Sequence, residues 1–411
     1  MRERLQFGKI FILGTGFMVI SMIWAAYNSY MPIFLGRYTD SNTFIGFVMV
    51  WDNVANLILL PIIGALSDRT YTRLGRRMPY IVIGMPLAGL LYILLPHMAT
   101  LPTIFGLLAM DLVFTIIVAL YRSPVVALMP DIVPEARRSE ANGIINLMGG
   151  LGALIMFFLG SQLYNMDPSY PFLFVGILSL LIPFLLFLTI REPAAAYRKE
   201  REIRRGEPLF RSLGRLVSAK EKGPLFTLLA IFFMTAGFGA VETFFTRYTK
   251  LVLGIPEGTS SFTLGFYALS FLIFSLPAGW IGARIGKRKM MITGALLLGL
   301  LILLFSSVHN FTLIQILLPV AGILNALFSI NSYPMVVSFT NERQVGTYTG
   351  FYYFFSSLAA ILSPPLFGWV VDRTGFTSLF IVSGISILWA GLIMMRVPER
   401  KNASVEPSTS I

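Results

Sequence analysis

GALSDRTYTRLGRRMP, residues 64–79, concentrates charge in a chain that otherwise carries little of it. Five charged side chains fall within ten positions of this stretch, whereas 56% of the 411 residues are hydrophobic and only 13% are charged. Apolar segments of about 20 residues, each long enough to cross a bilayer as a helix, lie on both sides of it. The stretch therefore predicts a polar hairpin between two membrane-spanning helices.

The rest of the chain repeats this arrangement. Mean hydropathy is +0.76, and turn or charge signals separate twelve apolar segments. A soluble protein of this length would need a polar shell that the composition cannot supply, so we predict an all-α membrane protein with twelve transmembrane helices. The predicted segments span residues 10–35, 42–66, 79–97, 101–129, 141–164, 171–190, 224–250, 262–283, 290–308, 311–337, 345–371 and 376–396.

The distribution of lysine and arginine predicts how the helices are oriented. The connections on one side, together with both ends of the chain, hold 27 of the 32 basic residues. Because loops rich in lysine and arginine stay in the cytoplasm, we predict a multi-pass protein of the plasma (cytoplasmic) membrane with both termini on the cytoplasmic side. Orientation and attraction to anionic lipid account for the net charge of +12, so we expect the lipid bilayer and no nucleic acid as a partner.

A charged linker divides the chain into two parts. We predict an N-terminal six-helix bundle over residues 1–190, a cytoplasmic linker over 191–223, a C-terminal six-helix bundle over 224–397 and a cytoplasmic tail over 398–411. Apolar residues recur at helical spacing among the arginines of the linker. This pattern fits either a short amphipathic helix on the membrane surface or a solvated connection.

The two parts resemble each other around the opening stretch. RLGRR at residues 73–77 returns as RIGKR at residues 284–288, between the second and third helices of each half. Such an internal repeat is typical of transporters, whose halves rock about a binding site between them.

Acidic side chains within the predicted helices are the first candidates for function, because a charge inside a bilayer costs about 2.5–3.5 kcal/mol on insertion scales. Helices 3, 6, 9 and 12 have no charged residue in their interiors, which predicts a central aqueous cavity lined by the others. Asp52 and Asp111 both lie about ten residues, or about 15 Å, in from the same side, and Glu242 lies at comparable depth in the second half. A buried carboxylate can take up a proton or bind Na⁺, so we predict that these three residues couple transport to H⁺ or Na⁺.

Uncharged polar side chains on the same helices are candidates for substrate binding. Tyrosine and asparagine offer donors and acceptors that suit a neutral polyhydroxy ligand, and Trp24 and Trp51 could stack on a sugar ring. A structural alternative applies throughout: polar residues also bond neighbouring helices together, and Glu242 could simply pair with Arg247. The predicted substrate-binding residues are Arg122, Tyr27, Asn28, Asn56, Asn146, Asn325 and Tyr352.

The opening stretch also carries a family resemblance. GALSDRTYTRLGRR resembles, in a lengthened form, the G-x-x-x-D-R-x-G-R-R signature of the major facilitator superfamily. The following MPYI and the segment PDIVPEARRSEANG, residues 130–143, resemble plant sucrose transporters and the wider glycoside–pentoside–hexuronide cation symporters. The resemblance implies two pseudo-symmetric six-helix bundles, alternating access, and proton- or sodium-coupled uptake of a glycoside.

The resemblance also implies roles for individual residues. Asp111 and Arg122 match an aspartate and an arginine of sucrose transporters, and Asp52 with Asp111 resembles the cation-binding carboxylates of melibiose-type symporters. Ala283 stands where the second loop would repeat the signature's aspartate, and Phe157 stands where drug–proton antiporters place a proline, which disfavours efflux. The residues that match the loop signature, and are expected to latch the two halves in one state, are Asp68, Arg69, Arg73, Gly75, Arg76 and Arg77.

Together these observations predict a secondary active transporter that imports a sugar or another glycoside with H⁺. An exporter of amphipathic small molecules is the main alternative, and a non-transporting membrane sensor is a third. The chain has no cysteine, no HExxH, no GxSxG and no phosphate-loop spacing, so we expect no enzyme, no metal site and no cofactor beyond the coupling ion. We expect a monomer whose partners are a small-molecule substrate and a cation.

Overall fold

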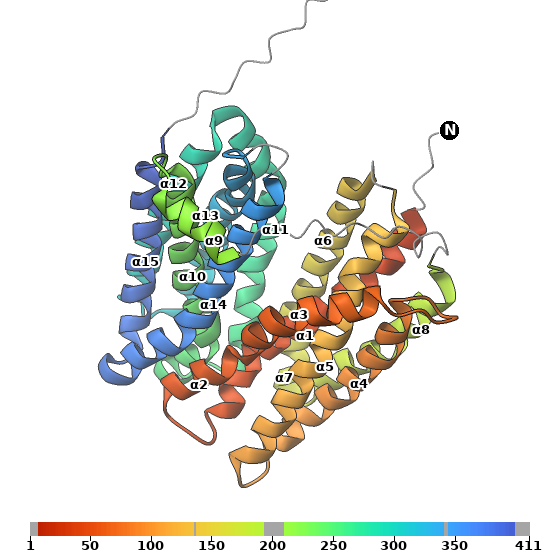
Figure 1. Ribbon diagram of the computed structural model, residues 1–411. Coiled ribbons are helices and arrows are strands. Elements are labelled where there is room, and N and C mark those ends of the chain that lie inside the picture. Colours follow the sequence, from red (N-terminus) through yellow and green to blue (C-terminus); the bar gives the residue numbers. More distant parts are fainter. Residues whose placement is uncertain (1–6, 135–136, 193–208, 341–343, 399–411) are drawn as a thin grey trace, which may run out of the picture.

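The computed structural model describes residues 7–134, 137–192, 209–340 and 344–398, and Figure 1 shows how its helices are arranged. The helices are α1 (Phe7–Leu35), α2 (Asn42–Met49), α3 (Trp51–Asp68), α4 (Met78–Met98), α5 (Ile104–Ile132), α6 (Arg138–Ile155), the π-helical turn η2 (Met156–Gly160), α7 (Ser161–Met166), α8 (Tyr170–Thr189), α9 (Leu209–Ser218), α10 (Gly223–Leu253), α11 (Glu257–Ile285), α12 (Lys287–Phe305), α13 (Phe311–Val337), α14 (Val345–Thr374) and α15 (Thr377–Met395).

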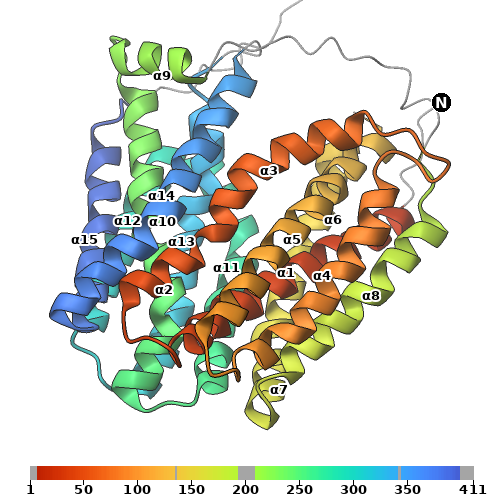
Figure 2. The ribbon, with the colours of Figure 1, turned by 60° about the horizontal axis from the view of Figure 1, so that its bottom comes forward.

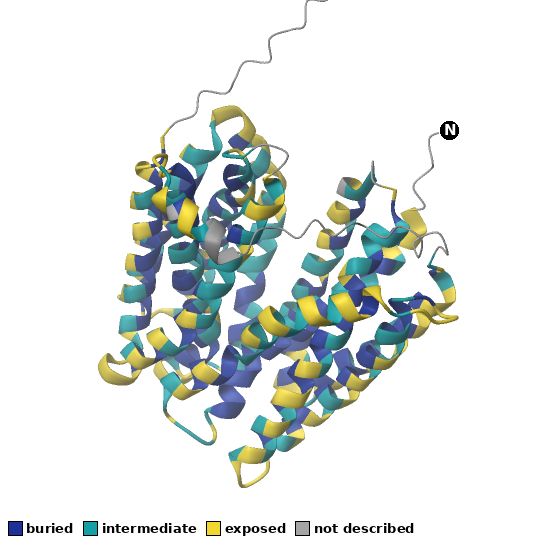
Figure 3. Ribbon diagram, in the orientation of Figure 1, coloured by how far each residue is buried: buried dark blue, intermediate teal, exposed yellow. Residues whose placement is uncertain are grey.

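The helices form two bundles, each with its own hydrophobic core. The first bundle, α1 to α8, buries aromatic rings such as Phe34 and Tyr92, and the second, α10 to α15, buries Phe305 and Phe328. The outer surfaces of both bundles carry many exposed residues (Figure 3), and large apolar side chains such as Leu188 and Trp389 are among the exposed ones. A large apolar outer surface is stable in contact with lipid but unfavourable in water.

The prediction of an all-α membrane protein with twelve transmembrane helices is confirmed. Within the described residues, twelve helical spans are long and apolar enough to cross a membrane. Helices suit this environment because they satisfy their backbone hydrogen bonds internally. The predicted ends are close to those observed: the segment predicted at 345–371, for example, forms the helix Val345–Thr374.

The second predicted helix is broken in the middle. α2 ends at Met49 and α3 begins at Trp51, with Val50 (φ −99°, ψ −2°) between them. α2 packs against α14 of the second bundle, whereas α3 packs against α5 of its own bundle. No glycine or proline stands at the break, so the packing on each side, and not the local sequence, accounts for it. The two parts of this helix therefore belong to different halves of the molecule.

The fifth predicted helix is also interrupted. α6 passes through the single π-helical turn η2 before continuing as α7, and both η2 and α7 contact α11 of the second bundle. Isolated π-helical turns within α-helices are frequent at functional sites. Here the turn lies where the two bundles meet.

The predicted linker contains one described helix. α9 packs against α10 and α14, and Leu216 is buried in the core of the second bundle. Leu213 and Leu216 of this helix thus contact the protein. The rest of the linker from residue 193 to 208, and the predicted tail from residue 399, lie outside the described residues.

The internal repeat is visible in the backbone. Gly75 and Gly286 have the same φ of 111°, and each stands just before the third membrane-spanning helix of its half. A residue with a side chain is strained at this φ. The surroundings differ, however: a Cβ at position 75 would lie 2.5 to 2.8 Å from carboxylate atoms of Glu192, whereas a Cβ at position 286 would have no neighbour within 4 Å.

This pair of glycines gives a matched test of the loop after α3. Gly286→Ala should cost about 1–3 kcal/mol from backbone strain alone, and Gly75→Ala should cost more because the new Cβ also displaces the Glu192 carboxylate. Melting temperatures of the two purified variants measure the difference. Equal shifts would show that the Glu192 contact contributes nothing to stability.

Candidate functional site

A polar cavity of about 260 Å³ lies between the two bundles. The first bundle contributes to it from α1, from the break between α2 and α3, and from α5, and the second contributes from α10 and α14. Polar side chains dominate its wall. The lining residues are Trp24, Asn28, Met49, Asp52, Asn53, Arg122, Thr235, Gly239, Glu242, Thr243, Ala360, Ser363 and Pro364.

Three charged side chains face this cavity, and two of them are acidic. Asp52 lies in the first turn of α3, where the positive end of the helix dipole favours an acidic group, and accepts a hydrogen bond of 3.0 Å from Asn53. The guanidinium of Arg122 lies 5.9 Å from the ring centre of Trp24 and attracts the Asp52 carboxylate without a direct ion pair. Glu242 makes no ion pair within the described residues. The cavity therefore holds an excess of acidic groups.

Two hydrogen-bonding atoms of the wall have no partner. The indole Nε1 of Trp24 and the Oγ of Ser363 are buried, and neither makes a hydrogen bond to any described residue. One belongs to the first bundle and the other to the second. A buried polar atom without a partner costs about 1–3 kcal/mol, and in the present arrangement both atoms are shielded from the cavity itself.

Asp111 lies behind the wall of this cavity. It is completely buried, and so is the neighbouring Tyr27, whose ring meets that of Trp24 edge to face at 5.4 Å. Both carboxylate oxygens of Asp111, the hydroxyl of Tyr27 and the hydroxyl of Thr115 lack hydrogen-bond partners among the described residues. The helix spacing places Thr115 one turn from Asp111, on the same face of α5. A small group such as a proton, a water or a cation would satisfy these oxygens.

A second and larger cavity, of about 840 Å³, adjoins the first at Glu242. Its wall comes from α6 and η2 of the first bundle and from α10 to α13 of the second. Most of the wall is apolar. The lining residues are Gly143, Asn146, Leu147, Gly150, Ala153, Phe157, Phe238, Val241, Glu242, Leu264, Tyr267, Ala268, Phe271, Leu272, Ser275, Leu276, Ile302, Leu318, Ala321, Asn325, Ser329 and Ile330.

The residues predicted to bind substrate are distributed over several places. Asn28 and Arg122 face the polar cavity, and Asn146 and Asn325 face the larger one. Neither cavity is lined by the three others, Tyr27, Asn56 or Tyr352. Tyr27 lies against Asp111 as described, the Oδ1 of Asn56 is buried without a partner among the described residues, and Tyr352 receives a 3.5 Å hydrogen bond from Ser332.

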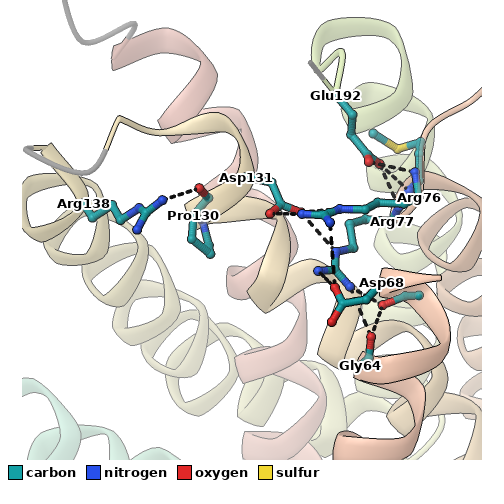
Figure 4. A network of polar contacts seen from close by, with 10 residues as sticks. Gly64, Asp68, Arg76, Arg77, Pro130, Asp131, Arg138 and Glu192 are labelled. Carbon is teal, nitrogen blue, oxygen red and sulfur yellow. Dashed lines mark hydrogen bonds and ion pairs between the residues drawn. The ribbon is translucent and has the colours of Figure 1, made fainter. Parts of the chain in front are cut away.

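Three of the predicted latch residues, Asp68, Arg76 and Arg77, lie in a dense polar cluster at one end of the first bundle, shown in Figure 4. Arg76 and Arg77 both bond Asp131 at the end of α5, and Arg77 also pairs with Asp68. The carboxylate of Glu192 accepts backbone N–H groups of Arg76, Arg77 and Met78 at 2.8 to 2.9 Å, and so caps the start of α4.

This cluster stays within the first bundle. Among the described residues, none of its hydrogen bonds or ion pairs reaches the second bundle, and the remaining signature residues Arg69 and Arg73 are exposed. In the second loop, the partners of Lys287 and Arg288 within the described part of the chain are backbone carbonyls, at 2.7 to 3.4 Å. The helices of the two bundles diverge towards this end of the molecule, which we call the Arg76 end (Figure 2).

At the opposite end, the Asp372 end, polar contacts join the bundles. The carboxylate of Asp372 on α14 accepts backbone N–H groups of Asn42 and Thr43 at 2.7 and 2.9 Å, together with the side chains of Ser41, Asn42 and Thr43 at 2.6 to 3.1 Å. The Asn42 amide in turn accepts a 2.8 Å bond from Arg247, which is 4% exposed. Arg247 thus contacts the start of α2 and not Glu242, the pairing that the sequence had left open.

Comparison with known proteins identifies the family to which this architecture belongs. The chain matches the sequence profile of the Major Facilitator Superfamily over residues 13–266 and 252–410.

The chain belongs to the Major Facilitator Superfamily.

Individual members of the superfamily are distant. A hexuronate transporter of Bacillus subtilis (strain 168) is 23% identical over 64% of this chain and 66% of its own. The alignments with curated relatives span between 28% and 66% of those proteins. Among solved structures, a bacterial homologue of the human lysosomal transporter Spinster, in an inward-facing and occupied conformation, aligns with a TM-score of 0.76 at 12% identity over 96% of this chain and 97% of its own. A D-xylose–proton symporter aligns with a TM-score of 0.69 at 15% identity, over 95% of this chain and 97% of its own.

Sequence reasoning missed four residues of this facilitator's polar network: Asp131, Glu192, Asn53 and Asp372. Asp131 lay inside the quoted segment 130–143, and Glu192 directly follows the sixth apolar segment, so an acidic residue at a helix end was the available signal. The partners of Asp372 are about 330 residues away in the chain. No local pattern indicates such a contact.

The clamp at the Asp372 end predicts a change in accessibility. Asp372→Asn removes the charge from five hydrogen bonds and should loosen the contact between the bundles. The side chain of Ser29 is 2% exposed and bonds Ser261 across the same interface. In a Ser29→Cys background, which carries the single cysteine of the chain, Asp372→Asn should raise the rate of maleimide labelling by about 10-fold or more.

Asp167→Asn is the matched control, because Asp167 lies in the loop between α7 and α8 and its carboxylate bonds Ser169 alone among the described residues. An unchanged labelling rate in Asp372→Asn, or an equal increase in the control, would contradict the role of the clamp.

Proposed function

We propose that this facilitator is a secondary active transporter that moves a sugar or other glycoside together with a proton by alternating access. The observation that carries the proposal is the polar cavity between the bundles, which the charged side chains of Asp52, Arg122 and Glu242 line together. Hydroxyl groups of a sugar both donate and accept, so they can donate to the two carboxylates while accepting from other groups of the wall. Arg122, Asn28 and Asn53 supply further donors on the same wall.

The acidic groups supply the proposed coupling. Asp52 and Glu242 face the cavity, and Asp111 is buried behind it with no hydrogen-bond partner in the described part of the chain. A carboxylate that lacks partners in a low-dielectric environment favours its protonated form. Protons are therefore the proposed coupling ion, and Na⁺ bound by the same oxygens is the alternative.

The asymmetry of the two ends supports alternating access. The bundles are joined at the Asp372 end, whereas the described contacts at the Arg76 end remain within one bundle. Transport would require the reverse arrangement as well, in which the clamp opens and the Arg76 end closes. With the basic loops in the cytoplasm of a plasma membrane, the present arrangement would face inward.

The relatives are compatible with this substrate class. One distant relative is a hexuronate transporter, and one solved neighbour is a D-xylose–proton symporter. The narrower resemblance to sucrose transporters, import as the direction and a monomeric state stay predictions.

Export of amphipathic small molecules is the second candidate. The apolar wall of the 840 Å³ cavity, which reaches Glu242, favours it. A sensitivity panel of apolar cations in a pump-deficient strain separates the two functions, since only the exporter would confer resistance.

The proposed coupling predicts a specific defect in Asp111→Asn. Proteoliposomes with an inward proton gradient should accumulate a labelled sugar from a panel of D-xylose, glucuronate and methyl glucoside. Asp111→Asn should lose this accumulation but keep sugar exchange at equal concentrations on both sides, because Asp111 lies behind the cavity and not on its wall. Asp52→Asn should also weaken sugar binding, by about 10-fold, because it removes a charged acceptor from the wall.

Asp167→Asn again serves as the control for a neutralised carboxylate. Sugar accumulation that is independent of the proton gradient would disprove proton coupling. Full sugar accumulation by Asp111→Asn would disprove the role of this residue in coupling. A chain that moves none of the three sugars but confers resistance to apolar cations would overturn the sugar proposal in favour of export.

A further inference from the structure

We propose that the larger cavity binds an apolar group attached to the sugar, so that the substrate is a glycoside with an apolar aglycone and not an unsubstituted sugar. This inference rests on the proposed function, since it assumes that the polar cavity holds the sugar. In this proposal, the parts of α11 and α13 that line the larger cavity determine which substrates bind.

The two cavities are arranged to hold one ligand with two parts. Thr235 and Gly239 on α10 face the polar cavity, Phe238 and Val241 face the larger one, and Glu242 faces both. With 3.6 residues per turn, these positions lie on adjacent faces of one helix with Glu242 between them. A ligand bound beside Glu242 therefore contacts both spaces.

The hydrogen-bonding state of the two walls differs. In the larger cavity the Asn325 amide bonds the Tyr267 hydroxyl and accepts from Ser329, while Asn146 and Ser275 bond backbone carbonyls of their own helices. Apart from Glu242, each of its polar side chains thus already makes at least one hydrogen bond. The polar cavity, by contrast, is lined by Asp52, Arg122 and Glu242, none of which forms an ion pair among the described residues.

This difference selects the chemistry of each part. A wall with unpaired charged groups favours a polar group, whereas an apolar wall whose few polar side chains already form hydrogen bonds gains little from one. Phe238, Phe271 and Leu272 line the larger space and offer apolar and aromatic surface. A ring or alkyl group is stabilised there by removal of its surface from water.

The larger cavity is also deep enough to enclose such a group. Its wall includes Ile302, Leu318 and Ala321, which are between 0% and 4% exposed and belong to the interior of the second bundle. From the first bundle, Gly143 and Gly150 of α6 line it without side chains. The space therefore extends from α6 into the second bundle.

Paired glycosides test the inference. Purified protein is titrated with methyl and phenyl glycosides of glucose, galactose, xylose and glucuronic acid, and binding is followed by the rise in melting temperature. For a sugar that binds, the phenyl glycoside should bind about 10- to 100-fold more tightly than the methyl glycoside, because its ring is buried in the larger cavity.

A cavity-filling variant locates the effect. Ala268 lines the larger cavity, so Ala268→Phe should occupy the space of the aglycone and bring the ratio of phenyl to methyl affinity close to one. Leu297→Phe introduces the same side chain on α12 at a residue that is 46% exposed and lines neither cavity, and should leave the ratio unchanged.

The outcomes separate this inference from the proposed function. Equal affinities for methyl and phenyl glycosides, or an unchanged ratio in Ala268→Phe, would overturn the inference while sugar binding stands. If no glycoside binds, both the sugar proposal and this inference fall. Binding of phenol or aniline as tight as that of the phenyl glycosides would likewise overturn both, because it would show that the sugar contributes nothing.

Discussion

The contact on which the arrangement of the molecule depends is the capping of α2 by Asp372. The carboxylate accepts the first backbone N–H groups of α2 across the interface between the bundles, and the helix dipole strengthens this contact. α2 is thereby held to α14, while α3 stays with α5. The break at Val50 lies between these two contacts, and Asp52, in the first turn of α3, lines the polar cavity beside it.

The buried charged side chains differ in whether they have hydrogen-bonding partners. Arg77 and Arg247 are almost fully buried, but Arg77 pairs with the carboxylate of Asp131, and Arg247 bonds the Asn42 amide and lies 3.9 Å from the carboxylate of Asp40. Asp111 is equally buried, but its oxygens have no partner among the described residues. Since an uncompensated buried charge is costly, the first two residues stabilise the structure, whereas Asp111 is suited to exchange a proton or cation.

The sequence was sufficient to predict the fold because twelve long apolar segments and their separating turns are local features. It was also sufficient to select Asp52, Arg122 and Glu242, which meet in one cavity, because charged residues inside apolar helices stand out in the sequence. It could not predict that Asp111 lies behind Tyr27, since the direction of a side chain depends on packing between helices. The break at Val50 and the clamp at Asp372 depend on contacts between distant segments and have no local signal.

We propose that the two bundles rock about the cavities, and that Asp372 holds the bundles in the present arrangement. The absence of cysteine allows spin labels at chosen pairs, and pulsed electron resonance gives the distances between them. The pair Arg73→Cys and Ile285→Cys reports on the Arg76 end, and the pair Leu101→Cys and Leu251→Cys reports on the Asp372 end. With Asp372→Asn, the first distance should shorten while the second lengthens. Distances that stay fixed, or that change at one end alone, would contradict the account.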